Sequence, residues 1–248
     1  ANSAAGDVVQ GASTLTQQYV KNYLLYVEAE TEAERLKATE QTPARKLKEA
    51  ILEYSNVVQI DPKNAKAHYK LGLSYLRMGM LREAYGEIVK TVEIDPKMLE
   101  ARNQLGSLYL LSGDSAKAKE QAEAILAQDA RNSGGHLLLS NISLRERKLD
   151  QAIEESRKAL EGDQKLDAYL HLAGLYVMKR DLPRAEEMLK AAVSVDEKSL
   201  RARYALAEFY LRSGKRELEE QEYNAATKIA PNDPSTVMTL GNFYLATR

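Results

Sequence analysis

Side chains that could bind a metal ion or act as nucleophiles are few and scattered in this 248-residue sequence. The three histidines, His68, His136 and His171, form no His-Glu-x-x-His pair, and without cysteine the chain has no thiolate zinc site. It also has no Gly-x-Ser-x-Gly nucleophile motif and no Gly-rich loop of the phosphate-binding type. We therefore expect no cofactor and no metal, and we expect the histidines to lie in the core or at its rim.

Adjacent glutamates are the other candidates for acid–base chemistry. Each has a Lys or Arg three or four residues away, which is typical of a solvated helix face and not of a catalytic pair. The residues concerned are Glu154, Glu155, Glu186 and Glu187.

Two strings near the start of the chain have the pattern of an enzyme. The first is GASTLTQQ at residues 11–18, and the second is RKLKE at residues 45–49. Together they resemble two motifs of the peptidoglycan glycosyltransferase domain of bifunctional penicillin-binding proteins, and the resemblance covers residues 1–49. It implies a site for a lipid-linked sugar pyrophosphate, with Glu49 as that family's second essential acid. The residues that would line the site are Gln17, Gln18, Arg45 and Lys46.

This resemblance leaves the chemistry incomplete. The motif with the family's catalytic glutamate, which acts as general base, is missing, and so are the helices that complete its lobe. Because acid–base chemistry at a glycosidic bond generally needs two positioned carboxylates, Glu49 alone makes no site and we expect no activity. Two alternatives remain for residues 1–47. They form an amphipathic helix capped by Ser13 or Thr14, or they are foreign to the rest of the chain.

The elements that must position any site follow a period of 34 residues. The strings LGLSYLRM, LGSLYLLS and LAEFYLRS come just before Gly79, Gly113 and Gly214. The third block of the series is one residue short. Full blocks are expected at 65–98, 99–132, 133–165, 166–199 and 200–233, with half blocks at 48–64 and 234–248.

Each block repeats the same chemistry at the same place. The seventh place is Leu, the eighth is small, the eleventh is Tyr except for Ser143, and the twentieth is Ala except for Glu219. A Gly near the fifteenth place and a Pro near the thirty-second end the two helices, although Lys148 and Gln164 stand near those places in the third block. This pattern resembles the tetratricopeptide repeat over residues 48–248. The resemblance implies an all-α fold, a right-handed superhelical solenoid of antiparallel helix pairs, with its weakest packing at the two departures.

The same resemblance implies a binding surface. In this family the inner wall of the solenoid is lined by the second, fifth, ninth, twelfth and thirteenth places, which here form an apolar row flanked by Arg and Tyr. Such a row suits a peptide with apolar anchors and some acidic character, whereas the Lys/Asn pattern of a chaperone-type carboxylate clamp is absent. The alternative is that the row packs against neighbouring helices or a second copy. The expected groove residues are Tyr69, Leu73, Leu76, Arg77, Asn103, Leu110, Leu111, Leu137, Asn141, Leu144, Arg145, Leu170, Val177, Met178, Tyr204, Leu211 and Arg212.

Composition and charge narrow the range of partners. The 35 Lys and Arg and the 36 Asp and Glu leave a net charge of -1, which argues against a nucleic-acid partner. No apolar run reaches the ~18–20 residues that a membrane span needs. A chain without cysteine fits either the cytoplasm or the periplasm of a bacterium, and the compartment stays open.

Three functions from different classes are consistent with these patterns. We expect a non-enzymatic scaffold or adaptor that binds a peptide or protein segment in its concave groove, within a bacterial multiprotein assembly. Self-association through uncapped repeat ends is a further expectation. The first alternative is a fragment or fusion of a peptidoglycan glycosyltransferase, an enzyme of cell-wall synthesis. The second is a structural spacer with no saturable partner.

Overall fold

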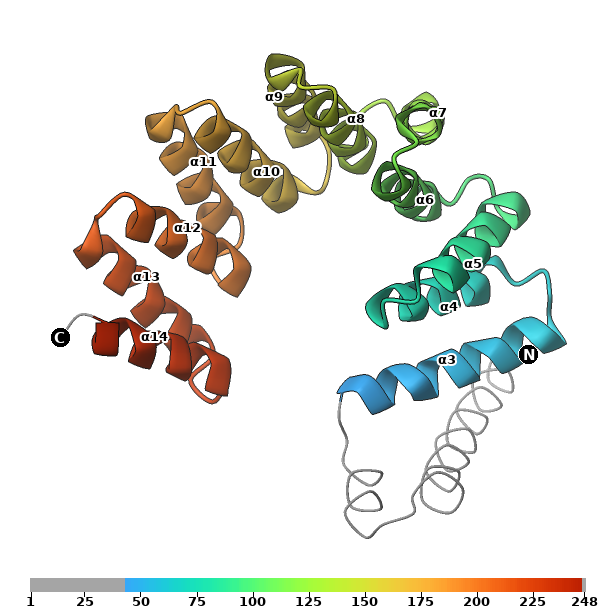
Figure 1. Cartoon of the computed structure of the whole chain (residues 1–248), viewed down its shortest axis with the longest axis horizontal. Helices are drawn as coiled ribbons and strands as arrows, with labels where there is room; N and C mark the ends of the chain where they lie inside the picture. Colours follow the sequence, from blue (N-terminus) through green and yellow to red (C-terminus); the bar gives the residue numbers. More distant parts are fainter. Residues whose placement is uncertain (1–42, 247–248) are drawn as a thin grey trace, which may run out of the picture. The chain divides into compact units, whose positions relative to one another are not determined.

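The computed structural model of the chain describes residues 43–246, and these residues form α-helices and one short 3₁₀ helix, with no strand among them (Figure 1). The helices follow one another through short turns, as the repeated blocks predict. Their bounds are α3 Pro43–Ile60, α4 Ala65–Arg77, α5 Leu81–Ile94, α6 Leu99–Ser112, α7 Ser115–Gln128, α8 Ser133–Arg145, α9 Leu149–Lys158, η2 Ala159–Glu161, α10 Lys165–Met178, α11 Leu182–Val195, α12 Leu200–Arg212, α13 Arg216–Ile229 and α14 Pro234–Ala246.

The chain divides into two compact units within α6, and the first unit ends at Leu108. Its described part holds α3, α4, α5 and the start of α6. The α4–α5 pair packs most extensively, and α3 packs against α4. A methyl group at Gly72 would lie 2.7 Å from the Ile88 side chain, and Ala84 is fully buried beside them. The small residues at the eighth and twentieth places therefore let the two helices approach closely.

The second unit begins at Tyr109, and its largest hydrophobic core runs through helices α9 to α12. Leu172 and Tyr176 of α10 lie at its centre, 1% and 3% exposed, with Leu189 of α11 and Leu206 of α12 packed around them. A smaller cluster joins α7 to α8 around Ala122 and Leu138. Within the larger core, successive helix pairs thus pack on one another, which is the packing expected of a solenoid.

The turns between the two helices of a pair need a left-handed residue at the fifteenth place. Gly79, Gly113 and Gly214 take it with φ of +75°, +94° and +68°. The third and fourth pairs use arginines instead, because Arg147 and Arg180 have φ of 61° and 62°. Lys148, which the sequence suggested as the residue in place of glycine, follows this position. The turn therefore forms without glycine at a cost in backbone energy.

The third block absorbs its missing residue in its second helix. Helix α9 has 10 residues, whereas α11 has 14, and it continues as the 3₁₀ helix η2. Ser133 secures this short end by donating a hydrogen bond to the Ala159 carbonyl (2.8 Å) and accepting one from the Gln164 backbone N–H (3.1 Å). At Gly162 an added Cβ would lie 2.3 Å from the Arg131 carbonyl oxygen, so only glycine fits there.

Candidate peptide-binding groove

The expected groove residues lie on the first helix of each pair, α4, α6, α8, α10 and α12, and they differ in exposure. At the twelfth place, Val177 is 39% and Leu211 56% exposed. Leu76, Leu110 and Leu144 are half-buried, and the last two pack against the core clusters. The accessible part of this row therefore lies on α10 and α12, while the other three leucines are less available to a ligand.

The thirteenth place is exposed in every pair. It presents Leu111 (65% exposed) and Met178 (58% exposed), together with Arg77, Arg145 and Arg212. Arg145 donates a hydrogen bond to the Leu110 carbonyl (2.7 Å). Arg212 pairs with Glu208, one turn earlier on α12, at 2.5 Å. Two of the three arginines are thus engaged within the chain, which weakens the ground for an acidic ligand.

The fifth and ninth places add polar and apolar groups that are mostly half-buried. Leu170 packs against the main core, and the exposed Asn141 is hydrogen-bonded to the His171 ring at 2.9 Å. The remaining residues at these places are half-buried: Tyr69, Leu73, Asn103, Leu137 and Tyr204.

A cleft of about 300 Å³ opens between α10 and α12. The predicted residues Leu170, Val177 and Arg212 line it, and Phe209 and Leu189 contribute apolar surface that the sequence did not single out. We call this space the apolar cleft. Its walls offer aromatic and aliphatic carbon with a charged pair at the rim, which suits an apolar side chain.

A second cleft, of about 560 Å³, lies between α12 and α14. Leu211 is the only predicted groove residue that lines it. We call it the acidic cleft, because Glu219 of α13 stands in its wall beside Arg216 and Tyr223. None of these three was predicted as a site residue. The sequence feature that could have indicated this cleft was Glu219 itself, a charged residue at the twentieth place, which is Ala in the other blocks.

Glu219 is 5% exposed, and burial raises the pKa of its carboxyl above the usual value. The nearby charge of Arg216 and a hydrogen bond from the Tyr223 hydroxyl oppose this shift without cancelling it. The folded protein therefore holds a poorly compensated carboxylate inside the second cleft.

A polar link between the two helices of a pair recurs through the fold and was missed in the sequence. His68 contacts Glu87 at 2.5 Å through Nδ1, and its Nε2 faces the Pro62 carbonyl at 3.2 Å. The same arrangement joins Arg203 to Glu222 at 3.0 Å. In these pairs the fourth place thus carries a basic residue and the twenty-third place carries a glutamate that contacts it.

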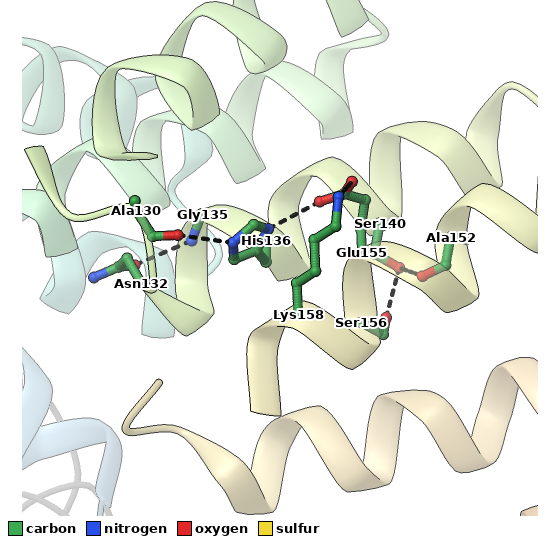
Figure 2. A network of polar contacts seen from close by, with 9 residues as sticks. All are labelled: Ala130, Asn132, Gly135, His136, Ser140, Ala152, Glu155, Ser156 and Lys158. Carbon is green, nitrogen blue, oxygen red and sulfur yellow. Dashed lines mark hydrogen bonds and ion pairs between the residues drawn. The ribbon is translucent and has the colours of Figure 1, made fainter. Parts of the chain in front are cut away.

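Figure 2 shows this link in the third pair, where His136 lies between the Ala130 carbonyl (3.1 Å) and Glu155 (2.8 Å). Lys158 also contacts Glu155 at 2.8 Å. Burial raises the pKa of Glu155, but the hydrogen bonds from Lys158 and His136 outweigh burial and lower it. Glu155 and Glu186 are half-buried, so their expected place on a solvated face was wrong.

The third histidine joins a different network. Ser140 donates to the Ala152 carbonyl and Ser156 donates to Ser140, both at 2.8 Å (Figure 2). The Ser156 hydroxyl oxygen in turn lies 2.9 Å from His171 Nδ1. Burial lowers the pKa of His171 and favours the neutral ring. The histidines are therefore packing groups, and no cluster of three metal-ligating side chains occurs in residues 43–246.

Helix α3 contains the second enzyme-like motif. Its Arg45 is 8% exposed and forms an ion pair with Glu49 at 3.1 Å, one turn along the same helix. Lys46 is exposed. Gln17, Gln18 and the capping residues Ser13 and Thr14 lie outside the described residues. No helix in the described part of the chain is long and apolar enough to span a bilayer.

Comparison with known proteins gives two family matches. The tetratricopeptide repeat model matches residues 103–168 and 170–234, more than half of the chain, and a second TPR repeat model matches residues 46–79. A transglycosylase model matches residues 1–62, in agreement with the resemblance of the N-terminal motifs. No curated protein matches the chain.

Solved structures with the same fold come from several bacteria. A tetratricopeptide repeat protein from Parabacteroides merdae aligns with a TM-score of 0.64 and 14% identity over 94% of this chain and 99% of its own. A thermophilic TPR protein of Thermus thermophilus aligns with a TM-score of 0.60 and 24% identity, over 73% of this chain and 99% of its own. Pseudomonas aeruginosa pilF aligns with a TM-score of 0.55 and 16% identity, over 73% of this chain and 87% of its own. At these identities the likeness shows the fold alone. The family models show that the chain belongs to the tetratricopeptide repeat family, and its repeats support a protein-interaction scaffold.

Proposed function

We propose that the chain is a non-enzymatic adaptor that binds a peptide or protein segment along the groove on α10 and α12. The apolar cleft carries this proposal. It combines Leu170 and Val177, two expected groove residues, with the ring of Phe209, and it is accessible from solvent. An apolar side chain of the partner would bury its surface there, which contributes ~1.5–3 kcal/mol for a Val-, Leu- or Phe-sized group.

A matched pair of valines tests the groove. Val177 (39% exposed) lines the apolar cleft, and Val195 (48% exposed) ends α11 outside it. We expect peptides selected from a random displayed library to lose binding to Val177→Asp and to keep binding to Val195→Asp, as measured by fluorescence anisotropy. Equal binding to both variants would show that the ligands use another surface. Leu110→Asp and Leu144→Asp are less suitable, because these side chains also pack in the core.

We also propose that residues 1–62 do not give the chain glycosyltransferase activity. In the described part of this segment, the one candidate acid, Glu49, is paired with Arg45 at 3.1 Å. Acid–base chemistry at a glycosidic bond generally uses two carboxylates. Polymerisation of lipid II by the chain, abolished by Glu49→Gln, would contradict this proposal. The transglycosylase match remains the ground for seeking the partner in a bacterial multiprotein assembly.

Self-association is a separate proposal, supported by the apolar surface of α14. Val237, Met238 and Leu245 are 51%, 65% and 70% exposed. We expect sedimentation velocity to show a concentration-dependent dimer that Met238→Asp disrupts. A monomer at all concentrations would contradict self-association and leave the groove proposal untouched.

A further inference from the structure

The apolar and acidic clefts are the same structural position in successive repeats. Val177 in the first corresponds to Leu211 in the second, one block later in the sequence. Phe209 and Phe243, the two phenylalanines of the chain, correspond in the same way. The clefts flank helix α12 on its two sides, so a ligand that follows the groove would meet both.

The chemistry of the two clefts differs on the wall formed by the second helix. In the apolar cleft this wall is Leu182 and Leu189. In the acidic cleft the corresponding residues are Arg216 and Tyr223, and Glu219 lies between them. Four other blocks have a fully buried alanine at the place of Glu219. A long acidic side chain has therefore been introduced where the repeat needs only a methyl group.

Within residues 43–246, the groups that act on the Glu219 carboxylate are the charge of Arg216 and the hydroxyl of Tyr223. An ionised carboxylate accepts about four hydrogen bonds, and Tyr223 supplies one. Arg216 lies near enough to affect the charge, but it also donates to the Ala246 carbonyl at the rim (3.4 Å). A buried charge of this kind is costly unless a partner compensates it.

We propose that the acidic cleft binds a lysine or arginine side chain of the peptide whose apolar side chain occupies the apolar cleft. This inference rests on the proposed function and adds the chemistry of the ligand. An ammonium or guanidinium group gives Glu219 the donors and the charge that it lacks. An apolar side chain would leave the carboxylate uncompensated, and an acidic one would face it directly.

The spacing of the two side chains follows from helix packing. Packed helices lie about 8–10 Å apart, and the two clefts are separated by the one helix α12. An extended chain advances about 3.3 Å per residue. The basic residue is therefore expected about three positions from the apolar one.

The probes are fluorescein-labelled peptides of sequence Gly-Ser-Leu-Ala-Ala-Lys-Ser-Gly, the same peptide with the order of Leu and Lys reversed, and versions with Arg, norleucine or Glu replacing Lys. Norleucine keeps the length of the lysine stem without its charge. We expect Lys and Arg peptides to bind the full chain at least about ten-fold more tightly than the norleucine peptide in one of the two orders, since hydrogen bonds between charged groups are stronger than neutral ones.

Variants at Glu219 locate the preference. Glu219→Ala restores the alanine that other repeats carry, so the fold should accept it, and Glu219→Gln keeps the shape. Both should reduce the preference for Lys over norleucine to less than about two-fold. Glu217→Ala, an exposed change on the same helix α13, is the control and should keep the preference. Thermal unfolding of each variant checks its fold.

The outcomes separate this inference from the groove proposal. Binding that requires the leucine but is equally tight with Lys, norleucine or Glu in the peptide would overturn the basic-side-chain assignment. The groove proposal would stand. Tightest binding by the Glu peptide, lost in Arg216→Ala, would overturn it in favour of an acidic ligand. Binding by none of the peptides, or binding that Val177→Asp does not affect, would overturn the groove proposal itself.

Discussion

At the scale of single residues, the turn arginines are placed against their backbone preference. Arg147 and Arg180 have φ near +60°, where a side chain costs about 1–2 kcal/mol relative to glycine. We expect Arg147→Gly and Arg180→Gly each to raise the free energy of unfolding by about 0.5–1 kcal/mol, after the greater freedom of glycine in the unfolded chain is subtracted. Urea denaturation measures this difference.

The reciprocal change isolates the backbone effect. Gly214 has φ of +68°, and a Cβ added there would meet nothing within 4 Å. Gly214→Ala should therefore lower the free energy of unfolding by about 1 kcal/mol through conformation alone. A neutral result in both directions would mean that these turns relax to another conformation.

Glu186 makes a second residue-scale prediction, on pH. Its carboxylate contacts Lys190 at 2.8 Å and Lys215 at 2.5 Å, and it accepts a hydrogen bond from Tyr210 at 3.3 Å. The hydrogen bonds from the two lysines lower the pKa of Glu186 from 4.5 to about 2. Because the folded pKa is depressed, the stabilisation is complete above about pH 4.5 and is lost as the pH falls towards 2.

We expect Glu186→Gln to lower the Tm near neutral pH and to lower it progressively less as the pH falls from about 4.5 to about 2. Glu187→Gln, a change at the exposed neighbouring residue, controls for the loss of one negative charge. Equal Tm shifts for the two variants at every pH would contradict a special role for the Glu186 contacts.

The sequence patterns predicted ion pairs within one helix better than contacts between different parts of the chain. Spacing along one helix correctly placed Lys158 near Glu155 and Lys190 near Glu186. It could not show His136 of α8 or Lys215 of the turn before α13, which reach the same carboxylates from elsewhere in the chain. The one available signal was the recurrence of a basic residue and an acidic or amide residue at the fourth and twenty-third places. In the fourth block these two places hold Tyr169 and Met188, so the basic residue and its partner are absent together.

At the scale of elements, the short third block depends on Gly162. An alanine Cβ there would lie 2.3 Å from the Arg131 carbonyl and 2.4 Å from the Ser133 hydroxyl, so η2 must move away from the start of α8. Overpacking of this kind costs about 1–3 kcal/mol. Gly162→Ala should lower the free energy of unfolding by that amount in urea denaturation.

Another glycine provides the control for this element. A Cβ added at Gly86, within α5, meets nothing within 4 Å, so Gly86→Ala should stabilise the protein by about 0.5–1 kcal/mol through helix propensity. A Gly162→Ala variant as stable as the unmodified chain would show that η2 is not held against α8. The length of the block predicted an irregularity here, whereas its location at the end of α9 depends on long-range contacts with Ser133.

At the scale of the whole molecule, the 34-residue period predicted the fold class because each block places the same residue types at the contacts within and between helix pairs. Leu at the seventh place and small residues at the eighth and twentieth are determined by contact within and between helix pairs. The binding surface was less predictable, because the exposure of a groove position depends on how far the next helix covers it. Leu144 and Leu211 occupy the same place in their blocks, yet only Leu211 is exposed.

The same organisation predicts that stability is distributed unevenly along the chain. In a solenoid each pair contacts only its neighbours, so local unfolding reflects local burial. Helix α10 buries Ala168, Leu172, Ala173, Leu175 and Tyr176, whereas α3 buries only Arg45. We expect amide hydrogen exchange to be slowest in α10 to α12 and fastest in α3 among the described helices.

A core mutation in α10 tests whether this unevenness is intrinsic to the repeats. Leu172 is 1% exposed at the centre of the main cluster, and Leu172→Ala should cost about 2–5 kcal/mol. Because α4 and α5 share no buried cluster with α10, we expect exchange to accelerate in α9 to α12 and to remain unchanged in α4 and α5. Faster exchange of equal size in both units would contradict neighbour-limited coupling, since it would require the chain to open as a single cooperative unit.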